Sequence, residues 1–388
     1  MKKILFICSN MNIGGFQKSL INLLKSFDYT KYEVDLFLIS EEGVFLDDIP
    51  KNVNMINLKN HKPYFFYETI RSIKKLIKYH NYLYLICRSI VSLVSFIDKG
   101  YGAILMSKFI PKIKKEYDCC IDYNGQYLNY YMIDRINAKR KITYFHSDYE
   151  KWDYYRNADK KYYKKADAIV TISETCVESL KKYFPQVSDK IYCIENIITN
   201  KTVSLSSNVK LKKEKDKLCI MTVGRVCIDK GLEYAVDAAV LLKKADIKFK
   251  WYWVGPGNDI IEHKQMLTDK NIEDVFEFLG PTNNPYDYIR AADICVYPSK
   301  FEGKSVVIEE TKIINKPIVV TNFSTVSNQI DNMKSGIIVE MNGYAVYEAI
   351  KKLIDDNQLA KDIVEYQKKY CLGNGKEIEK LYNLINND

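Results

Sequence analysis

The chain has 388 residues, 47% of them hydrophobic and 28% charged, with a formal net charge of +9. This length exceeds one ordinary hydrophobic core and suits about two domains, while the composition excludes a disordered or fibrous protein. The ten cysteines and four histidines show no CxxC or CxxC…H spacing, so we expect reduced, buried thiols and neither disulfides, zinc nor a histidine-rich metal site.

The first residues predict a strand, a glycine loop and a helix. KKILFICS is a short apolar run, and the polar Ser9 and Asn10 end it too early for a signal peptide. NMNIGGFQKSLINLLKSF follows, with Gly14 and Gly15 ahead of apolar positions at helical spacing. We therefore expect a cytoplasmic protein that opens on a buried strand and a glycine loop.

A basic, aromatic insert occupies residues of about 60–115. Between residues 51 and 115, thirteen lysines and arginines stand against only Glu68 and Asp98, a local charge of +11. Arg88 divides the longest apolar run, so a transmembrane helix is excluded. Two interpretations stay open: helices that lie on an anionic bilayer, or a solvated helical face with one buried helix. Nucleic-acid binding is disfavoured because no recognition motif accompanies the charge.

Short apolar runs alternate with helical stretches through both halves of the chain. This alternation predicts parallel, doubly wound sheets and the α/β class. The polar residues 199–216 lack any apolar period and are expected to link two domains. The strand-like runs are 2–9, 32–40, 53–58, 117–124, 141–147, 167–173 and 190–196 before the linker, and 217–225, 249–257, 275–280, 294–299, 316–321 and 335–341 after it.

The predicted organisation is two domains and a returning helix. The first domain covers residues 1–198 and the second 217–370, and the last helix, within 371–388, is expected to pack back on the first domain. Two doubly wound domains place a cleft between the carboxyl ends of their sheets, where ligands bind in this architecture.

The segment MTVGRVCIDKG predicts a site for a diphosphate. Gly224 ends a strand and lets backbone approach a ligand, and the helix that begins after Lys230 and Gly231 offers free amides to an anion. Arg225 can bind phosphate oxygens through a bidentate fork, and Lys230 adds a point charge. Alone, such residues are common at strand ends.

The segment KFEGKSVVIEETKIIN places three carboxylates in a loop and a following helix. Glu302 lies in the loop, and Glu309 and Glu310 lie on the helix. Ionised carboxylates only accept hydrogen bonds, so they suit ligands rich in hydroxyl groups, such as a sugar and a ribose. The alternative is a glutamate at the helix start and a surface glutamate further along the helix.

The ordered set of motifs resembles the retaining glycosyltransferases of family 4 (glycosyl transferases group 1), which have the GT-B fold of two Rossmann-like domains. The resemblance covers most of the chain, and single motifs are unspecific. The motifs, in the family's order, are GG-x-x, HSDY, ADAIVTIS, IEN, VGR…KG, VGPG, FLG, ADICVYPS, EG-x6-E and KPIVVT.

The resemblance implies a role for each matching residue of the second domain. Arg225 and Lys230, with Gly224 beside them, would hold the donor diphosphate and stabilise the charge on the leaving group. Glu310 would accept hydrogen bonds from the ribose, and Glu302 from the transferred sugar. The spacing from Glu302 favours Glu310 over its neighbour for the ribose.

Further roles are implied for two loops. The backbone around Gly303, Lys304 and Ser305 would help to bind sugar or phosphate. Gly14 and Gly15 would form the loop of the first domain that faces the diphosphate.

His146 would lie beside the sugar and the reaction centre, and Asn196 would be structural at the hinge. A lone histidine is more often structural, but its place at a strand end favours the functional role. The chain departs from the commonest family pattern at Gln17, at Lys304 with its neighbour, and at Asn315. None of these departures removes a phosphate or ribose ligand, and Lys304 is the one that bears on the choice of donor sugar.

The resemblance implies a retaining hexosyl- or N-acetylhexosaminyltransferase that uses a nucleotide-sugar, with a UDP-sugar favoured and no cofactor. No Asp-x-Asp motif occurs in the chain, so no metal is expected. The expected acceptor is a saccharide, preferably lipid-linked, in capsule, O-antigen or wall glycan assembly at the inner face of the cytoplasmic membrane. Two alternatives stay open: a nucleotide-sugar epimerase of the same fold, and a non-catalytic partner subunit.

Overall fold

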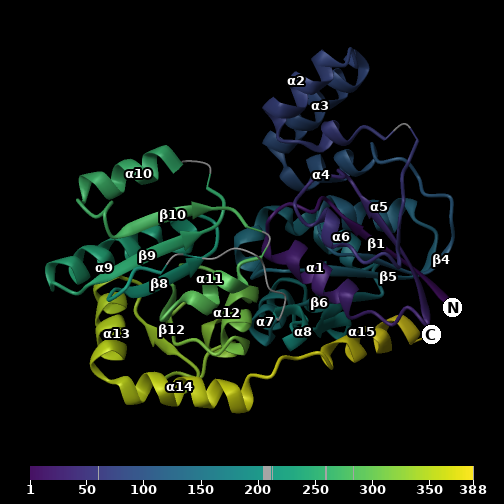
Figure 1. Cartoon of the computed structure of the whole chain (residues 1–388). Coiled ribbons are helices and arrows are strands. Elements are labelled where there is room, and N and C mark those ends of the chain that lie inside the picture. The colour runs from purple at the N-terminus through teal and green to yellow at the C-terminus, as the bar shows by residue number, and fades with distance from the viewer. Residues whose placement is uncertain (60, 204–210, 212, 258–259, 283, 388) are drawn as a thin grey trace. The chain divides into compact units, whose positions relative to one another are not determined.

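The computed structural model describes residues 1–59, 61–203, 211, 213–257, 260–282 and 284–387 (Figure 1). The chain forms two compact units. The first unit is Met1–Glu195 together with Lys376–Asp388, and the second is Asn196–Gly375.

The first unit contains a parallel sheet in the order β3-β2-β1-β4-β5-β6-β7. This is a doubly wound order that reverses direction between β1 and β4. Its strands are β1 (Lys2–Cys8), β2 (Tyr32–Leu38), β3 (Val53–Met55), β4 (Tyr117–Asp122), β5 (Ala138–Phe145), β6 (Ala168–Thr171) and β7 (Ile191–Cys193). Its α-helices are α1 (Gly15–Lys25), α2 (Thr69–Lys78), α3 (Tyr82–Ile97), α4 (Lys99–Ser107), α5 (Tyr127–Arg135), α6 (Arg156–Tyr163), α7 (Glu174–Tyr183) and α15 (Glu377–Asn386). Its 3-10 helices are η1 (Leu46–Asp48), η2 (Pro63–Phe66), η3 (Tyr149–Tyr155) and η4 (Pro185–Lys190).

The second unit contains a parallel sheet in the order β10-β9-β8-β11-β12-β13. Its strands are β8 (Leu218–Val223), β9 (Phe249–Val254), β10 (Phe276–Gly280), β11 (Ile294–Tyr297), β12 (Ile318–Thr321) and β13 (Ile337–Val339). Its α-helices are α8 (Asn200–Val203), α9 (Leu232–Lys244), α10 (Ile260–Asp269), α11 (Tyr286–Ala291), α12 (Val306–Ile313), α13 (Gly343–Asp355) and α14 (Asn357–Tyr370), and its 3-10 helices are η5 (Ile228–Lys230) and η6 (Val326–Asn328).

Helices cover both faces of the second sheet, and this explains why its strands are apolar throughout. Ile220 and Trp251 pack on the face covered by α9 and α13, whereas their neighbours Met221 and Tyr252 pack on the face covered by α11 and α12 (Figure 1). Successive strand residues point to opposite faces, so a strand buried on both sides reads as a continuous apolar run. The predicted α/β class and the strand–helix alternation are therefore confirmed.

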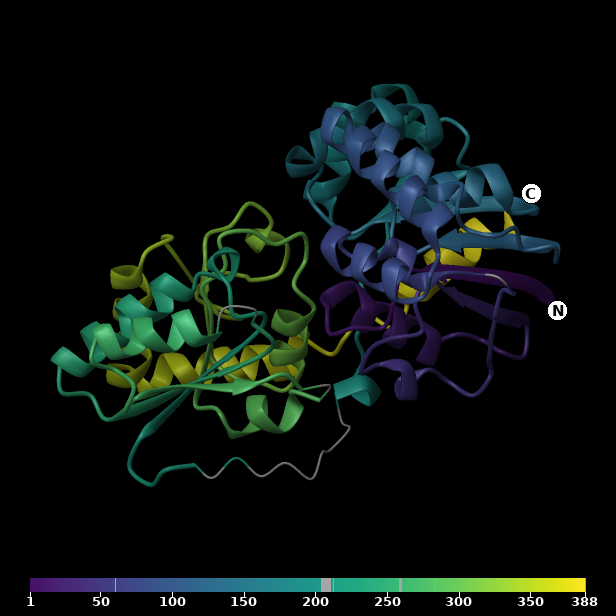
Figure 2. The ribbon, with the colours of Figure 1, turned by 90° about the horizontal axis from the view of Figure 1, so that it is seen from above.

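The basic insert folds as three helices of the first unit, α2, α3 and α4, blue in Figures 1 and 2. Helix α4 packs against α5 and α6, while α3 packs on α4 and α2. Helix α3 is only partly buried: Arg88 and Val91 lie inside, whereas one side of the helix is exposed at Leu83, Ile86, Ile90, Leu93 and Ile97.

Residues 196–199 run beside the segment that precedes the last helix, and both belong to the second unit. The Asn374 side chain accepts a hydrogen bond from Ile198 N (2.8 Å) and donates one to Asn196 O (3.0 Å), and Thr199 bridges Gly373. The units therefore divide after Glu195, three residues before the boundary predicted from the sequence.

Part of the predicted linker is structured. Helix α8 lies within residues 199–216, and its Val203 is buried against Tyr286 and Val306 of the second unit. Residues 204–210 and 212 of that linker lie outside the described residues. The polar composition hid this short helix because only one of its side chains is apolar.

Helix α15 packs on the first unit through Tyr382. Its ring stacks on Tyr32 with 5.0 Å between centroids and meets Phe27 edge-on at 5.3 Å. Its hydroxyl accepts a hydrogen bond of 2.7 Å from the backbone N–H of Asp28. A residue more than 350 positions away in sequence thus completes the first unit.

Within the part of the chain that the structure describes, every helix is too short or too polar to cross a lipid bilayer.

Replacing Tyr382 by alanine should lower the free energy of unfolding by about 3–5 kcal/mol, because it removes a buried aromatic ring. Tyr382→Phe keeps the ring and should cost only about 1 kcal/mol for the lost hydrogen bond. Tyr370→Ala is the control, since Tyr370 is exposed, and should change stability by less than about 0.5 kcal/mol. Urea denaturation followed by circular dichroism measures all three. Equal losses for Tyr382→Ala and Tyr370→Ala would contradict this role of α15.

Candidate functional site

In the second unit, the residues predicted to bind the donor lie where the strand order of the sheet reverses direction. Strands β8 and β11 are neighbours in the sheet, and the chain leaves them toward α9 and α12. In a doubly wound sheet, ligands bind outside the carboxyl ends of such a strand pair. Gly224 and Arg225 follow β8 directly, and Glu302 lies in the loop after β11.

A close backbone contact joins the loops that follow these two strands. Gly231 has φ of 71°, and a Cβ atom there would lie 1.7 Å from the carbonyl oxygen of Pro298. Only glycine fits a left-handed position with so little space. Next to this contact, the backbone N–H of Lys300 donates a 2.9 Å hydrogen bond to Asp229 O. The residues around Lys230 are thereby fixed against the loop that carries Glu302.

Lys230 and Glu302 form a mostly buried ion pair. The same carboxylate oxygen accepts a 3.0 Å hydrogen bond from Ser299 Oγ, and the Glu302 carbonyl accepts one of 2.9 Å from Thr325 Oγ1. The ammonium of Lys230 and the carboxylate of Glu302 are thus held next to each other. The predicted clamp and the predicted sugar ligand belong to one cluster.

Arg225 is exposed at the edge of this cluster and makes no side-chain hydrogen bond or ion pair with the described residues. Its guanidinium is therefore not committed to a protein carboxylate, unlike the ammonium of Lys230. The neighbouring Gly224 carbonyl accepts a 2.9 Å hydrogen bond from Trp253 Nε1, which holds the strand end in place.

The structure distinguishes the two adjacent glutamates of α12. Glu310 is 2% exposed, and its Oε1 accepts a 2.8 Å hydrogen bond from the hydroxyl of Tyr286. Glu309 instead pairs with Lys312 at 2.8 Å and accepts a 3.0 Å hydrogen bond from Gln329 Nε2. The alternative of a surface glutamate is therefore wrong for Glu310, which lies inside the unit.

Gln329 fixes the start of α12, and the sequence carried no signal for this role. Its Oε1 accepts a hydrogen bond from Ser305 N (2.7 Å), and its Nε2 donates one to Ser305 O (2.8 Å). Both residues are buried, as is the adjacent Lys304. The backbone N–H of Ser305 thus already donates a hydrogen bond within the protein. It is therefore not available to a ligand that binds at the loop around Gly303.

In the first unit, His146 follows β5 and lies beside the glycine loop. Phe16, the residue after Gly15, stacks on its imidazole with ring centroids 6.0 Å apart, and Tyr123 lies 4.6 Å from it. Gly14 is the N-terminal cap of α1 in the same loop. The first unit thus brings together Gly14, Gly15 and His146, as the second brings together Lys230 and Glu302.

The hydrogen bonding of His146 defines its tautomer. Its Nε2 lies 3.0 Å from the carbonyl oxygen of Tyr123, so Nε2 carries the proton and donates. Its Nδ1 is buried without a hydrogen-bond partner among the described residues and is an acceptor. Burial lowers the pKa of His146 to about 4, so the imidazole is neutral near neutral pH.

No group of three or more His, Cys, Asp and Glu side chains placed to hold a metal ion occurs among the residues that the structure describes.

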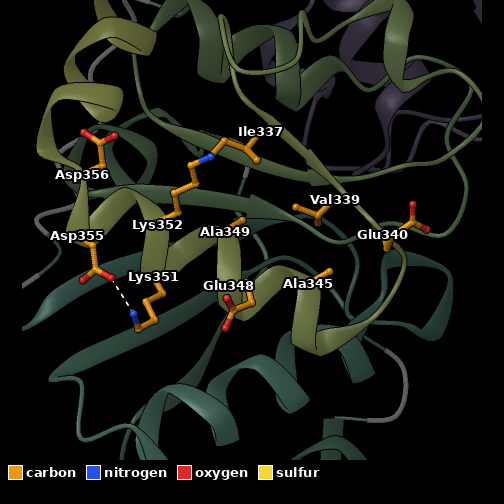
Figure 3. Close-up of a pocket in the computed structure, with 10 residues that line it drawn as sticks. All are labelled: Ile337, Val339, Glu340, Ala345, Glu348, Ala349, Lys351, Lys352, Asp355 and Asp356. Atoms are coloured by element: carbon orange, nitrogen blue, oxygen red, sulfur yellow. Dashed lines mark hydrogen bonds and ion pairs between the residues drawn. The ribbon is translucent and has the colours of Figure 1, made fainter.

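A surface depression of about 670 Å³ between β13 and α13 is lined by residues such as Val339 and Lys352 and includes none of the predicted site residues (Figure 3).

Comparison with known proteins confirms the predicted fold and relates part of the chain to a glycosyltransferase family. Residues 205–370 match the family described as "Glycosyl transferases group 1". A Campylobacter jejuni relative, N-acetylgalactosamine-N,N'-diacetylbacillosaminyl-diphospho-undecaprenol 4-alpha-N-acetylgalactosaminyltransferase, is 28% identical over 51% of this chain and 54% of its own length. The Staphylococcus aureus capsular polysaccharide biosynthesis glycosyltransferase CapM is 25% identical over 43% and 46%. The chain thus spans about half the length of the curated relatives it matches.

Solved structures match the whole chain. Anabaena HepE in complex with UDP-glucose has a TM-score of 0.71 at 14% identity, over 99% of this chain and 100% of its own. A Rickettsia africae glycosyltransferase has a TM-score of 0.70 at 17% identity, over 100% and 99%. The fold is therefore the GT-B fold, with two Rossmann-like units.

Replacing His146 by glutamine should make the protein relatively more stable at acid pH. Because the pKa of His146 is about 4 when folded and about 6.5 when unfolded, only the unfolded state gains its proton between these values. The stability from the neutral ring is complete above pH 6.5 and is lost as pH falls toward 4. The stability of the variant minus that of the wild type should thus rise by about 2 kcal/mol between pH 7 and 4.5.

Urea denaturation at both pH values measures this difference. Burial raises the pKa of Asp122 to about 7 and of Asp159 to about 6, so these groups also titrate in this range. They are present in both proteins and cancel in the difference. A difference that does not change with pH would show that His146 is solvated.

Proposed function

We propose that the chain transfers a hexosyl or N-acetylhexosaminyl group from a nucleoside-diphosphate-sugar to a saccharide acceptor, with retention of configuration at the anomeric carbon. The observation that carries this proposal is the Lys230–Glu302 pair beside Arg225 at the carboxyl ends of β8 and β11. A cation suited to phosphate and a carboxylate suited to sugar hydroxyls lie next to each other there, in the part of the chain that matches glycosyl transferases group 1.

Arg225 and Lys230 would bind the diphosphate of the donor. Charge-assisted hydrogen bonds to phosphate are stronger than neutral ones, and they strengthen further as charge develops on the departing nucleotide. Lys230 is already held by Glu302, so its ammonium needs little reorganisation when a phosphate arrives. These two cations would supply this electrostatic stabilisation without a metal.

The carboxylates would orient the two ends of the donor. Glu302 has one oxygen bound by Lys230 and Ser299, and would accept hydrogen bonds from the transferred sugar with its other oxygen. Glu310, which accepts a hydrogen bond from Tyr286, would accept hydrogen bonds from the ribose. Both carboxylates are held by protein donors before substrate binds.

His146 and the loop of Gly14 and Gly15 would act from the first unit. Because Nδ1 of His146 is a neutral acceptor, it would take a hydrogen bond from a hydroxyl of the transferred sugar. In this reaction the bond from the anomeric carbon to the phosphate oxygen breaks, and a bond to the acceptor oxygen forms on the same face. The acceptor proton passes to the departing phosphate, so no protein base is required.

The acceptor would be a lipid-linked saccharide, and the donor a UDP-sugar. The lipid-linked acceptor is supported by the basic insert of the first unit and by the name of the Campylobacter jejuni relative, which acts on a diphospho-undecaprenol-linked saccharide. The UDP-sugar is supported by HepE, which binds UDP-glucose. CapM supports a place in capsular or related surface polysaccharide assembly, at the inner face of the cytoplasmic membrane.

A thermal-shift screen against UDP, GDP, ADP and CDP, in magnesium and in EDTA, tests donor binding. One nucleotide, expected to be UDP, should raise the melting temperature equally in both buffers, since about 2.7 kcal/mol of stabilisation is available at 100 times Kd. Arg225→Ala/Lys230→Ala should abolish the shift, because each lost charged hydrogen bond costs about 1.5–3 kcal/mol.

The matched control is Lys244→Ala/Lys264→Ala, which removes two exposed cations of the second unit and should keep the full shift. No shift with any nucleotide in folded protein would favour a non-catalytic partner subunit. An equal shift in the Arg225/Lys230 variant would place the nucleotide elsewhere.

A further inference from the structure

The outer side of α3 is an apolar stripe that the first unit leaves uncovered. Leu83, Ile86, Ile90, Leu93 and Ile97 recur at intervals of three and four, so they share one side of the helix. These five residues form the α3 stripe.

The C-terminal end of α3 is highly exposed. Ile97, the last residue of the stripe, is 80% exposed, and its neighbour Phe96 is 90% exposed. Soluble monomers rarely leave contiguous apolar patches of this kind open to water, so the stripe marks an interaction surface.

The inner side of α3 contains a buried arginine, Arg88. Arg88 is 6% exposed; it donates to Ser92 Oγ (2.8 Å), to Thr69 Oγ1 (3.1 Å) and to the Tyr67 carbonyl (3.3 Å). The buried arginine thereby ties α3 to the start of α2.

The inward side of α3 is apolar as well, because Val91 is buried in one cluster with Phe65 and Leu76. A helix that is apolar on both sides needs a second surface to cover its outward side, so the stripe is expected to face something other than water.

Basic residues of α2 accompany the stripe. Arg71, Lys74 and Lys78 are exposed on α2, which packs against α3 and also exposes Ile70 and Ile77. Arg71 pairs with Glu42 at 3.4 Å. Lys74 and Lys78 form no ion pair with the described residues. Figure 1 shows α2 and α3 standing away from the sheet of the first unit, with α4 between them and that sheet.

We propose that the α2–α3 surface, made of the α3 stripe, Phe96, Arg71, Lys74 and Lys78, binds an anionic phospholipid bilayer. At the boundary between head groups and hydrocarbon, a bilayer offers acyl chains to the stripe and, closer to its surface, lipid phosphates to the lysines. A second copy of the chain would instead bring together two surfaces from a region of charge +11, which repel. At 16 residues, or about 24 Å, α3 would lie in the plane of the bilayer rather than cross it. This proposal does not rest on glycosyl transfer, because it follows from the surface of the first unit.

Sedimentation of the full chain with vesicles tests the proposal. Vesicles with 30% phosphatidylglycerol in phosphatidylcholine should bind the wild type, and pure phosphatidylcholine should bind it far more weakly. Lys74→Gln/Lys78→Gln should lower binding to the anionic vesicles about 25-fold, since each lysine near the surface contributes about fivefold. Leu93→Gln/Phe96→Gln should lower it at least tenfold while keeping the charge.

Matched control variants replace exposed residues of the same types in the second unit. Ile261→Gln/Tyr344→Gln replaces two exposed apolar residues, and Lys244→Gln/Lys264→Gln removes two exposed lysines; both should bind vesicles as the wild type does. Circular dichroism verifies that each variant is folded. The proposal is overturned if the wild type does not bind anionic vesicles, or if the stripe and control variants bind alike. A dimer in light scattering that only Leu93→Gln/Phe96→Gln dissociates, without vesicle binding, would assign the surface to a second copy.

Discussion

Every strand in each sheet is parallel, and the placement of the functional residues depends on this constraint. In such a sheet all strand-to-helix loops leave from one edge, so residues distant in sequence are brought together there. Lys230 and Glu302, 72 positions apart, form their ion pair for this reason. The contact of Gly231 with Pro298 then fixes the distance between the two loops.

The residues of the cluster at this edge are held by contacts within the protein. Lys230 and Ser299 donate to one oxygen of Glu302, and Tyr286 donates to Glu310, while Arg225 keeps its guanidinium exposed. A site built in this way is oriented before a ligand arrives, which lowers the cost of binding. Within the first unit, His146 has a neutral ring whose pKa is lowered by burial.

The sequence was sufficient to predict those parts of the structure that one local pattern determines. Strands buried on both faces appear as apolar runs, and their alternation with helical stretches predicted both parallel sheets. It was insufficient where the partner is distant. Gln329 lies 24 positions from Ser305, and no pattern in the polar segment around it indicates their hydrogen bonds. The sequence also did not show which side of α3 is inward, because that side is defined by the tertiary contacts of Arg88 and Val91.

The measurement that tests the central claim most directly is a double-mutant cycle on UDP affinity with Lys230→Met, Glu302→Gln and the combined variant. Isothermal titration calorimetry on folded protein gives the four dissociation constants. If Lys230 binds the diphosphate while held by Glu302, Lys230→Met should weaken binding at least tenfold, and the two changes should couple by about 1 kcal/mol or more. Unchanged affinity in Lys230→Met, or effects that add within about 0.3 kcal/mol, would contradict the account.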